Sequence, residues 1–158
     1  MNMSGKIGEQ LWANYLEGRG WSITYAPDMR FYDWDIKANS EERELTFEVK
    51  YDSKAYWWAE RRKTPNQPNL YIEFQNTKKK TPSGIYMSKA DYYVYIMKKE
   101  EENTAYVYTR EVLCKFCETG DFKVVGNSGF GDDNAKGWIP PLYKTLEEDA
   151  GFIRKINL

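Results

Sequence analysis

The chain of 158 residues contains no histidine. This absence excludes every site that needs an imidazole, among them Ser-His-Asp and Cys-His nucleophiles, zinc centres with histidine ligands, and nucleases whose general base is histidine. Acid–base or metal chemistry must therefore be carried out by carboxylates, lysine, tyrosine, cysteine or bound water.

Long apolar runs and cysteines are also scarce. No stretch approaches the roughly 20 apolar residues of a membrane span, and the opening residues MNMSGKIGEQ lack the apolar core of a secretory signal. The two cysteines are Cys114 and Cys117, whereas a disulfide-stabilised secreted domain normally carries more. We expect a soluble cytoplasmic protein with no membrane partner and with both thiols buried and reduced.

Neither sign of charge predominates, because 23 Lys and Arg residues face 24 Asp and Glu residues, for a formal net charge of −1. A protein that coats DNA indiscriminately needs a strongly basic balance, so that class is excluded. Apolar residues make up 41% of the chain and aromatic residues 16%, which is enough for a real core. We expect one domain over residues 1–158.

The hydrophobic pattern alternates between helical and strand periods along the chain. A helix is expected before Gly18, with an apolar face that includes Trp12 and Leu16 and has Glu9 at its edge. Further helices are expected over 109–118 and 145–155, and an irregular segment and a loop over 51–69 and 126–137. Strands are expected over 21–25, 31–38, 44–51, 70–75, 92–97 and 105–108. This order predicts an α/β domain with a central mixed β-sheet flanked by helices.

Acidic residues share one face of the hairpin that is predicted over 31–51. Period two places Asp33 and Asp35 on one face of the first strand, and Glu48 and Lys50 on one face of the second. Asp35 and Glu48 on adjacent strands can chelate a hard divalent cation, and the backbone carbonyl of Val49 can add a ligand. The pattern alone leaves open whether Asp33 takes the place of Asp35.

Two further residues fit phosphodiester chemistry at such a cation. Lys50, on the face of Glu48, can orient a water molecule or stabilise charge on a pentavalent phosphorus. Glu9 can hold the cation or a water beside it if its helix packs against the hairpin. The predicted catalytic set is therefore Glu9, Asp35, Glu48 and Lys50, and the predicted metal ligands are Asp35, Glu48, Val49 and Glu9.

The order of these residues resembles the PD-(D/E)XK nuclease superfamily, and within it the Holliday junction resolvase and phage endonuclease group. That group has a helical Glu, then a strand with Asp-hydrophobic-x-Ala, then Glu-Val-Lys. Here these motifs are Gly8-Glu9, Asp35-Ile36-Lys37-Ala38 and Glu48-Val49-Lys50, within the first half of the chain. The chain departs from the pattern at Trp34, where the family has proline.

The resemblance implies a restriction-endonuclease-like fold and a DNA endonuclease that depends on Mg²⁺ or Mn²⁺. It also implies branched DNA, such as a four-way junction, as the substrate. A homodimer is implied too, because two symmetric cuts require two active sites. If the chain is phage-encoded, the expected location is the host cytoplasm.

Basic residues outside the motifs are candidates for DNA contact. A segment that interleaves aromatic and basic residues ends in Arg61, Arg62 and Lys63, and a predicted loop carries Lys78, Lys79 and Lys80. Aromatic rings can stack on unpaired bases, while lysine and arginine bind phosphates. Ser88 and Lys89, just before a strand, are further candidates near the cut. For the aromatic pair Trp57-Trp58, a place in the core or in a dimer contact is an equal alternative.

Two other functions remain open from the sequence. One is a different PD-(D/E)XK deoxyribonuclease, of the restriction, exonuclease or nickase type. The other is a non-catalytic module that binds nucleic acid, or binds sugar through its tryptophans. A metal-dependent cleavage assay separates the first class from the second.

Overall fold

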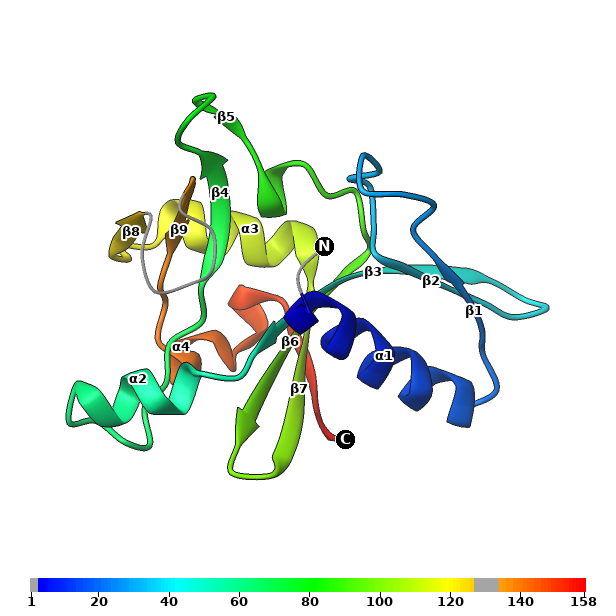
Figure 1. Ribbon diagram of the computed structural model, residues 1–158, viewed down its shortest axis with the longest axis horizontal. Coiled ribbons are helices and arrows are strands. Elements are labelled where there is room, and N and C mark those ends of the chain that lie inside the picture. The colour runs from blue at the N-terminus through cyan, green and yellow to red at the C-terminus, as the bar shows by residue number, and fades with distance from the viewer. Residues whose placement is uncertain (1–2, 127–133) are drawn as a thin grey trace.

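A six-stranded mixed sheet forms the centre of the protein (Figure 1). The computed structural model describes residues 3–126 and 134–158. The strands lie in the order β1-β2-β3-β6-β7-β10, and only β3 and β6 pair in parallel. Their bounds are β1 Ser22–Tyr25, β2 Ile36–Asn39, β3 Glu44–Asp52, β6 Tyr92–Lys99, β7 Glu102–Thr109 and β10 Phe152–Asn157. The expected α/β class with a central mixed sheet is confirmed.

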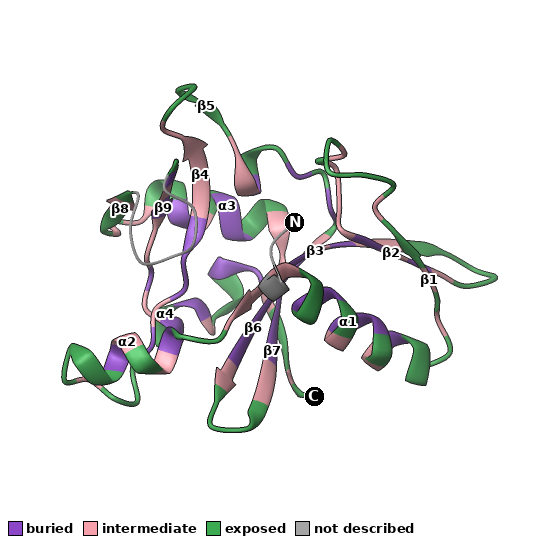
Figure 2. Ribbon diagram, viewed as in Figure 1, coloured by how far each residue is buried: buried purple, intermediate pink, exposed green. Residues whose placement is uncertain are grey.

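Helices cover both faces of this sheet. The long helix α1 (Met3–Gly18) buries Trp12 and Leu16 in a core with Val94 and Ile96 of β6. The opposite face of β6 presents the alternate residues, which pack with helix α3 (Arg110–Thr119). Period two in β6 and β7 thus builds two cores, and both strands are largely buried (Figure 2).

A second, four-stranded sheet lies on the α3 side and has the order β5-β4-β9-β8. Its strands are β4 Ile72–Asn76, β5 Thr81–Pro82, β8 Val124–Gly126 and β9 Ala135–Trp138. The rings of Phe74 in β4 and Trp138 in β9 stack with their centroids 4.1 Å apart. The expected strand over 70–75 therefore exists, with shifted bounds, but it belongs to this second sheet and does not neighbour the β2–β3 hairpin.

The strand that was expected over 31–38 is wrong in its first half, because β2 begins only at Ile36. Residues before it form a loop in which the rings of Phe31 and Trp34 meet edge to face, 4.8 Å between centroids. The backbone of this loop bonds elsewhere, since the carbonyl of Asp33 accepts a hydrogen bond from the amide of Lys89 at 2.8 Å. A local tertiary contact thus replaces the strand pairing that alternation predicts.

Three other segments differ from expectation. The irregular segment 51–69 contains helix α2 (Ala55–Arg61), which buries Ala55 and Ala59. The expected helix over 145–155 is mostly absent. Helix α4 (Leu142–Thr145) ends at the first residue of that range, and within the range only Glu148–Ala150 forms a short 3₁₀ turn. Another 3₁₀ turn spans Gly84–Tyr86. Gly151, at φ 77°, ends the Glu148–Ala150 turn, after which β10 pairs with β7.

The loop expected over 126–137 contains the last residue of β8 and most of β9, while residues 127–133 lie outside the described residues. Cys114 and Cys117 are free and buried, as expected. Burial raises the pKa of both thiols to about 12.

Within residues 3–126 and 134–158, none of the helices combines the length and the apolar character that crossing a bilayer requires.

Gly8 allows α1 to approach β3 closely. A Cβ atom at this position would lie 2.7 Å from the Cβ of Tyr51, closer than real side chains come. We predict that Gly8→Ala lowers the free energy of unfolding by about 1–3 kcal/mol, because the helix must move away from the strand. Denaturation in urea measures this change.

Gly18, at the end of the same helix, provides the matched control, since a Cβ atom added there would meet nothing within 4 Å. Gly18→Ala should leave the stability unchanged or raise it slightly, because alanine loses less backbone entropy than glycine. Equal stability of the Gly8→Ala and Gly18→Ala proteins would contradict the close approach.

Candidate active site

The carboxylates of Asp35 and Glu48 meet at the start of the β2–β3 hairpin. Asp35 directly precedes β2, and its amide donates to the carbonyl of Phe47 at 2.9 Å. Its Oδ2 accepts a hydrogen bond from the amide of Val49 at 2.8 Å. Glu48 lies between these two β3 residues, close enough for a hydrogen bond between the two carboxyl groups. The hairpin register therefore brings both side chains to one place.

The desolvation of Asp35 and Glu48 is only partly offset by the positive charge and hydrogen bonds around them. It raises the pKa of Asp35, although the Val49 amide, the Lys50 ammonium and the hydrogen bond with Glu48 act in the opposite direction. Burial raises the pKa of Glu48 well above its usual range, and the neighbouring charge of Asp35 adds to this. Such a pair holds a proton or attracts a cation, because two buried like charges are costly.

Glu9 adds a third carboxylate nearby. Its side chain projects from α1, next to Gly8, and is only 8% exposed. Burial first, and then the charge of Asp35, raise the pKa of Glu9 to about 7, against a lowering effect of Lys6. The predicted helix does pack against the hairpin. Among the residues that the structure describes, however, no three Asp, Glu or Cys side chains gather closely enough to form a metal-binding group.

Lys50 and Val49 take different places around the pair. The Lys50 ammonium is near enough to lower the pKa of both Asp35 and Glu48. The Val49 side chain is buried in the core on the α1 side, and its amide is used by Asp35. The four predicted catalytic residues are thus brought together.

Ser88 and Asp33 complete the surroundings. The Ser88 hydroxyl donates to the carbonyl of Asp33 at 3.3 Å and is also within hydrogen-bond range of Glu48, whose pKa it lowers. Ser88 is buried, so it is not at the surface position expected of a DNA contact. The Asp33 carboxylate lies 4.0 Å from the Lys89 ammonium. Asp35, and not Asp33, therefore faces Glu48.

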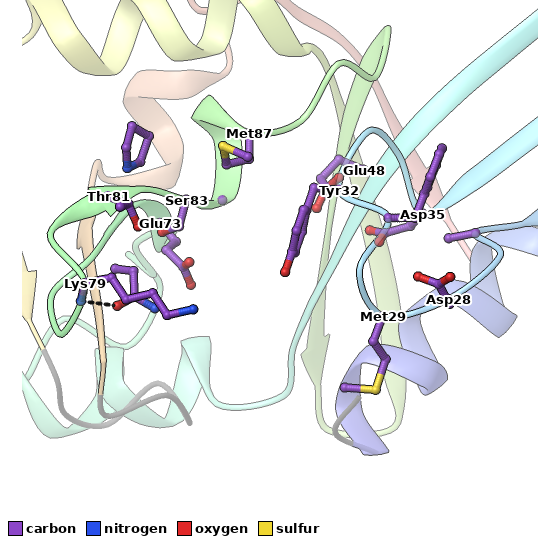
Figure 3. Close-up of a pocket in the computed structure, with 15 residues that line it drawn as sticks. Asp28, Met29, Tyr32, Asp35, Glu48, Glu73, Lys79, Thr81, Ser83 and Met87 are labelled. Atoms are coloured by element: carbon purple, nitrogen blue, oxygen red, sulfur yellow. Dashed lines mark hydrogen bonds between the residues drawn. The ribbon is translucent and has the colours of Figure 1, made fainter.

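The pair opens into a cleft of about 580 Å³ (Figure 3). One wall is the loop before β2, with Asp28, Met29 and Tyr32, and the other is the β4–β5 hairpin, with Glu73 and Lys79. Figure 3 shows Asp35 and Glu48 on one side of the cleft and Glu73 and Lys79 on the other. No pattern in the sequence pointed to Asp28 or Tyr32 as part of the site.

Two of the three comparisons with known proteins found nothing: no family model matches the chain, and no curated protein sequence matches it. Among solved structures, the chain is similar to the bacterial homing endonuclease I-Ssp6803I, with a TM-score of 0.51 and 17% sequence identity. The similarity covers 70% of this chain and 69% of that one. The fold of this chain resembles that of this endonuclease. At this identity the likeness concerns the fold alone.

Apart from Ser88 and Lys89, the predicted DNA-binding residues fall into two groups. Lys78, Lys79 and Lys80 occupy the turn between β4 and β5, all exposed, and Lys79 lines the cleft. Arg61, Arg62 and Lys63 lie at the end of α2, at the opposite end of the molecule from β5 (Figure 1).

The guanidinium of Arg61 stacks on the ring of Trp57 at 4.1 Å, and that of Arg62 bonds to the carbonyl of Gln67 at 3.5 Å. The basic end of α2 is therefore not brought to the cleft, whereas the hairpin lysines are.

Glu9 should make stability depend on pH. A carboxyl whose pKa rises from 4.5 to about 7 on folding opposes folding above pH 4.5, and the effect is complete above pH 7. We predict that Glu9→Gln raises the free energy of unfolding at pH 8 by about 1–3 kcal/mol and has little effect near pH 4.5. Chemical denaturation across this pH range measures the difference.

The control is Glu17→Gln, which changes an exposed carboxylate on the same helix. Because Glu17 is exposed, this change should leave the free energy of unfolding at pH 8 nearly unchanged. A constant difference between the Glu9→Gln and wild-type proteins from pH 4.5 to 8 would refute the raised pKa.

Proposed function

We propose that the protein is a DNA endonuclease that hydrolyses phosphodiester bonds with the help of a divalent cation. The observation that carries this proposal is the partly buried pair Asp35 and Glu48, which lines an open cleft and has the Lys50 ammonium within electrostatic range. The nuclease-like fold supports it, since the similar solved structure is that of a homing endonuclease.

The donor set fits Mg²⁺ or Mn²⁺. Asp35 and Glu48 offer carboxylate oxygens whose buried charge is incompletely offset, and Mg²⁺ is commonly held by one or two carboxylates together with water and substrate phosphate. Asp35 and Glu48 would hold the cation, with the Val49 carbonyl as a further donor and Glu9 beside them. When bound, such a cation supplies Lewis acidity, which strengthens water as a nucleophile and neutralises phosphate charge.

Other residues of the chain would have separate roles in the reaction. Lys50 places a positive charge next to the carboxylates, where it stabilises the extra negative charge of a pentavalent phosphorus. Glu9, with a pKa of about 7, can exchange a proton with water near neutral pH. The Ser88 hydroxyl is within hydrogen-bond range of the Glu48 carboxylate. Lys79, on the opposite wall, is placed to contact a phosphate of the strand that enters the cleft.

For the substrate we propose branched DNA, such as a four-way junction, cut by a homodimer in the cytoplasm. The support is the ordered set of Glu9, Asp35 and Glu48-Val49-Lys50, which resembles the Holliday junction resolvase group. The second candidate is another deoxyribonuclease of this fold that cuts duplex DNA. The similarity to a homing endonuclease favours that candidate.

Cleavage should depend on a divalent cation and on the predicted site. We predict that Glu48→Gln and Lys50→Ala each lower the rate of DNA cleavage in Mg²⁺ by at least about 100-fold, because each removes a charge that the transition state requires. EDTA should abolish cleavage by the wild-type protein. A gel assay with end-labelled DNA measures all three effects.

Glu44→Gln is the matched control on the same strand, where the carboxylate is exposed and only 3.7 Å from Lys37. It should cleave at the wild-type rate. Native-rate cleavage by either Glu48→Gln or Lys50→Ala would show that the site is elsewhere.

The substrate is tested by comparing a synthetic four-way junction with linear duplex and single-stranded DNA of the same sequence. We predict paired, symmetric cuts in the junction and at least about 10-fold slower cutting of the linear forms, because a dimer aligns two active sites with two strands. Cutting of linear duplex at a fixed sequence, at an equal or higher rate, would favour the second candidate.

A further inference from the structure

Besides the β4–β5 wall of the cleft, an aromatic ring at the start of the second sheet contacts the candidate site. Tyr71, directly before β4, is 3% exposed, and the centre of its ring lies 5.8 Å from the Lys50 ammonium, within the range of a cation–π contact. On β9, a Cβ at Gly137 would lie 2.6 Å from Cε2 of this ring. The ring is thus packed against the β9 backbone while it contacts Lys50.

The central sheet fixes the backbone of Tyr71. Its amide donates to the hydroxyl of Tyr95 at 2.9 Å, and that hydroxyl donates to Oδ2 of Asp52 at 2.8 Å. Tyr95 is fully buried on β6, and in the parallel register it is the partner of Lys50 on β3. The residue that pairs with Lys50 therefore also anchors the ring that contacts Lys50.

A lysine side chain has four rotatable bonds and loses considerable entropy when it is held in one place. Asp35 and Glu48 attract its ammonium, but Lys50 is only partly buried, so its side chain can also turn toward solvent. Contact with a buried, anchored ring restricts that freedom at little cost. We propose that Tyr71, anchored by Tyr95, is a positioning residue that keeps the Lys50 ammonium at the Asp35–Glu48 pair. The catalytic consequence rests on the proposed function; the placement of Lys50 does not.

The placement is tested by NMR of protein labelled with ¹³C at the lysine ε carbons, with the Lys50 signal assigned by its loss in Lys50→Arg. The ring of Tyr71 should shift this signal away from those of exposed lysines. Tyr71→Phe should keep the shift, and Tyr71→Leu should remove it. Tyr143→Leu, the same change at a side chain that is 57% exposed, should leave it unchanged. A Lys50 signal that Tyr71→Leu does not move would overturn the proposal.

Tyr95→Phe provides a second variant in case Tyr71→Leu does not fold. It keeps the ring of Tyr95 in the core and removes only the hydroxyl that holds Tyr71. The Lys50 signal should move part of the way toward that of an exposed lysine. An unchanged signal in a folded Tyr95→Phe protein would show that the hydroxyl does not anchor the ring.

Cleavage kinetics test the consequence. Tyr71→Leu should lower kcat on the order of 10- to 100-fold with little change in KM, because misplacing a catalytic group slows the chemical step more than binding. Tyr71→Phe should recover the rate. In a Lys50→Ala background, Tyr71→Leu should cause no further loss, since the two changes affect one element. Losses that multiply would overturn the proposal.

The two proposals fail separately. A shifted Lys50 signal that depends on Tyr71, in a protein that cleaves no DNA, would leave the positioning intact and refute the nuclease. Metal-dependent cleavage by a protein whose Lys50 signal does not change in Tyr71→Leu would refute the positioning and leave the nuclease function standing.

Discussion

The partial burial of Asp35 and Glu48 side by side is the constraint on which the rest of the site depends. Two adjacent carboxylates that have lost much of their contact with water are costly, and such a pair persists only where its surroundings supply donors and positive charge. Here the Val49 amide, the Ser88 hydroxyl and the Lys50 ammonium do so. They come from β3 and from the segment before β6, so the pair exists only once these have met. These groups do not fully offset the negative charge of Asp35 and Glu48, and this remaining charge would favour a cation.

Several features of the fold bring the residues of the site together. The parallel pairing of β3 with β6 sets Tyr93 beside Glu48 and Tyr95 beside Lys50, so these two site residues each have a buried aromatic neighbour. Gly8 lets α1 lie against β3, which brings Glu9 next to the pair. The second sheet then packs on the α3 side, where it supplies the far wall of the cleft. The site thus depends on both cores at once.

Whether a feature of the fold or of the site could be predicted depends on how far apart in the sequence the interacting residues lie. Alternation in the hairpin placed Glu48 and Lys50 on one face, and the helical period placed Glu9 at the edge of its apolar stripe; both patterns are local, and both agree with the structure. The wall with Glu73 and Lys79 could not be found this way, because β4 pairs with β9, which lies far along the chain, and no local pattern encodes that pairing. The interleaved basic and aromatic segment misled in a different way. Its pattern is that of a DNA contact, but α2 lies away from the cleft, and Arg61 stacks on Trp57, one turn earlier in the same helix.

The chain is nearly neutral as a whole, but its charged residues are unevenly distributed around the cleft. Asp28, Asp35, Glu48 and Glu73 line the cleft, against one lysine, Lys79. A cleft with this excess of carboxylates repels a phosphate backbone, so electrostatic attraction cannot be what brings DNA to it. Under the proposed function, a divalent cation held by Asp35 and Glu48 would offset this negative charge, and the hairpin lysines would add to its field. Under the proposed function, binding of the substrate and activation of the water therefore rest on the same ion, which explains how a protein with almost no net charge can select a phosphodiester without coating DNA.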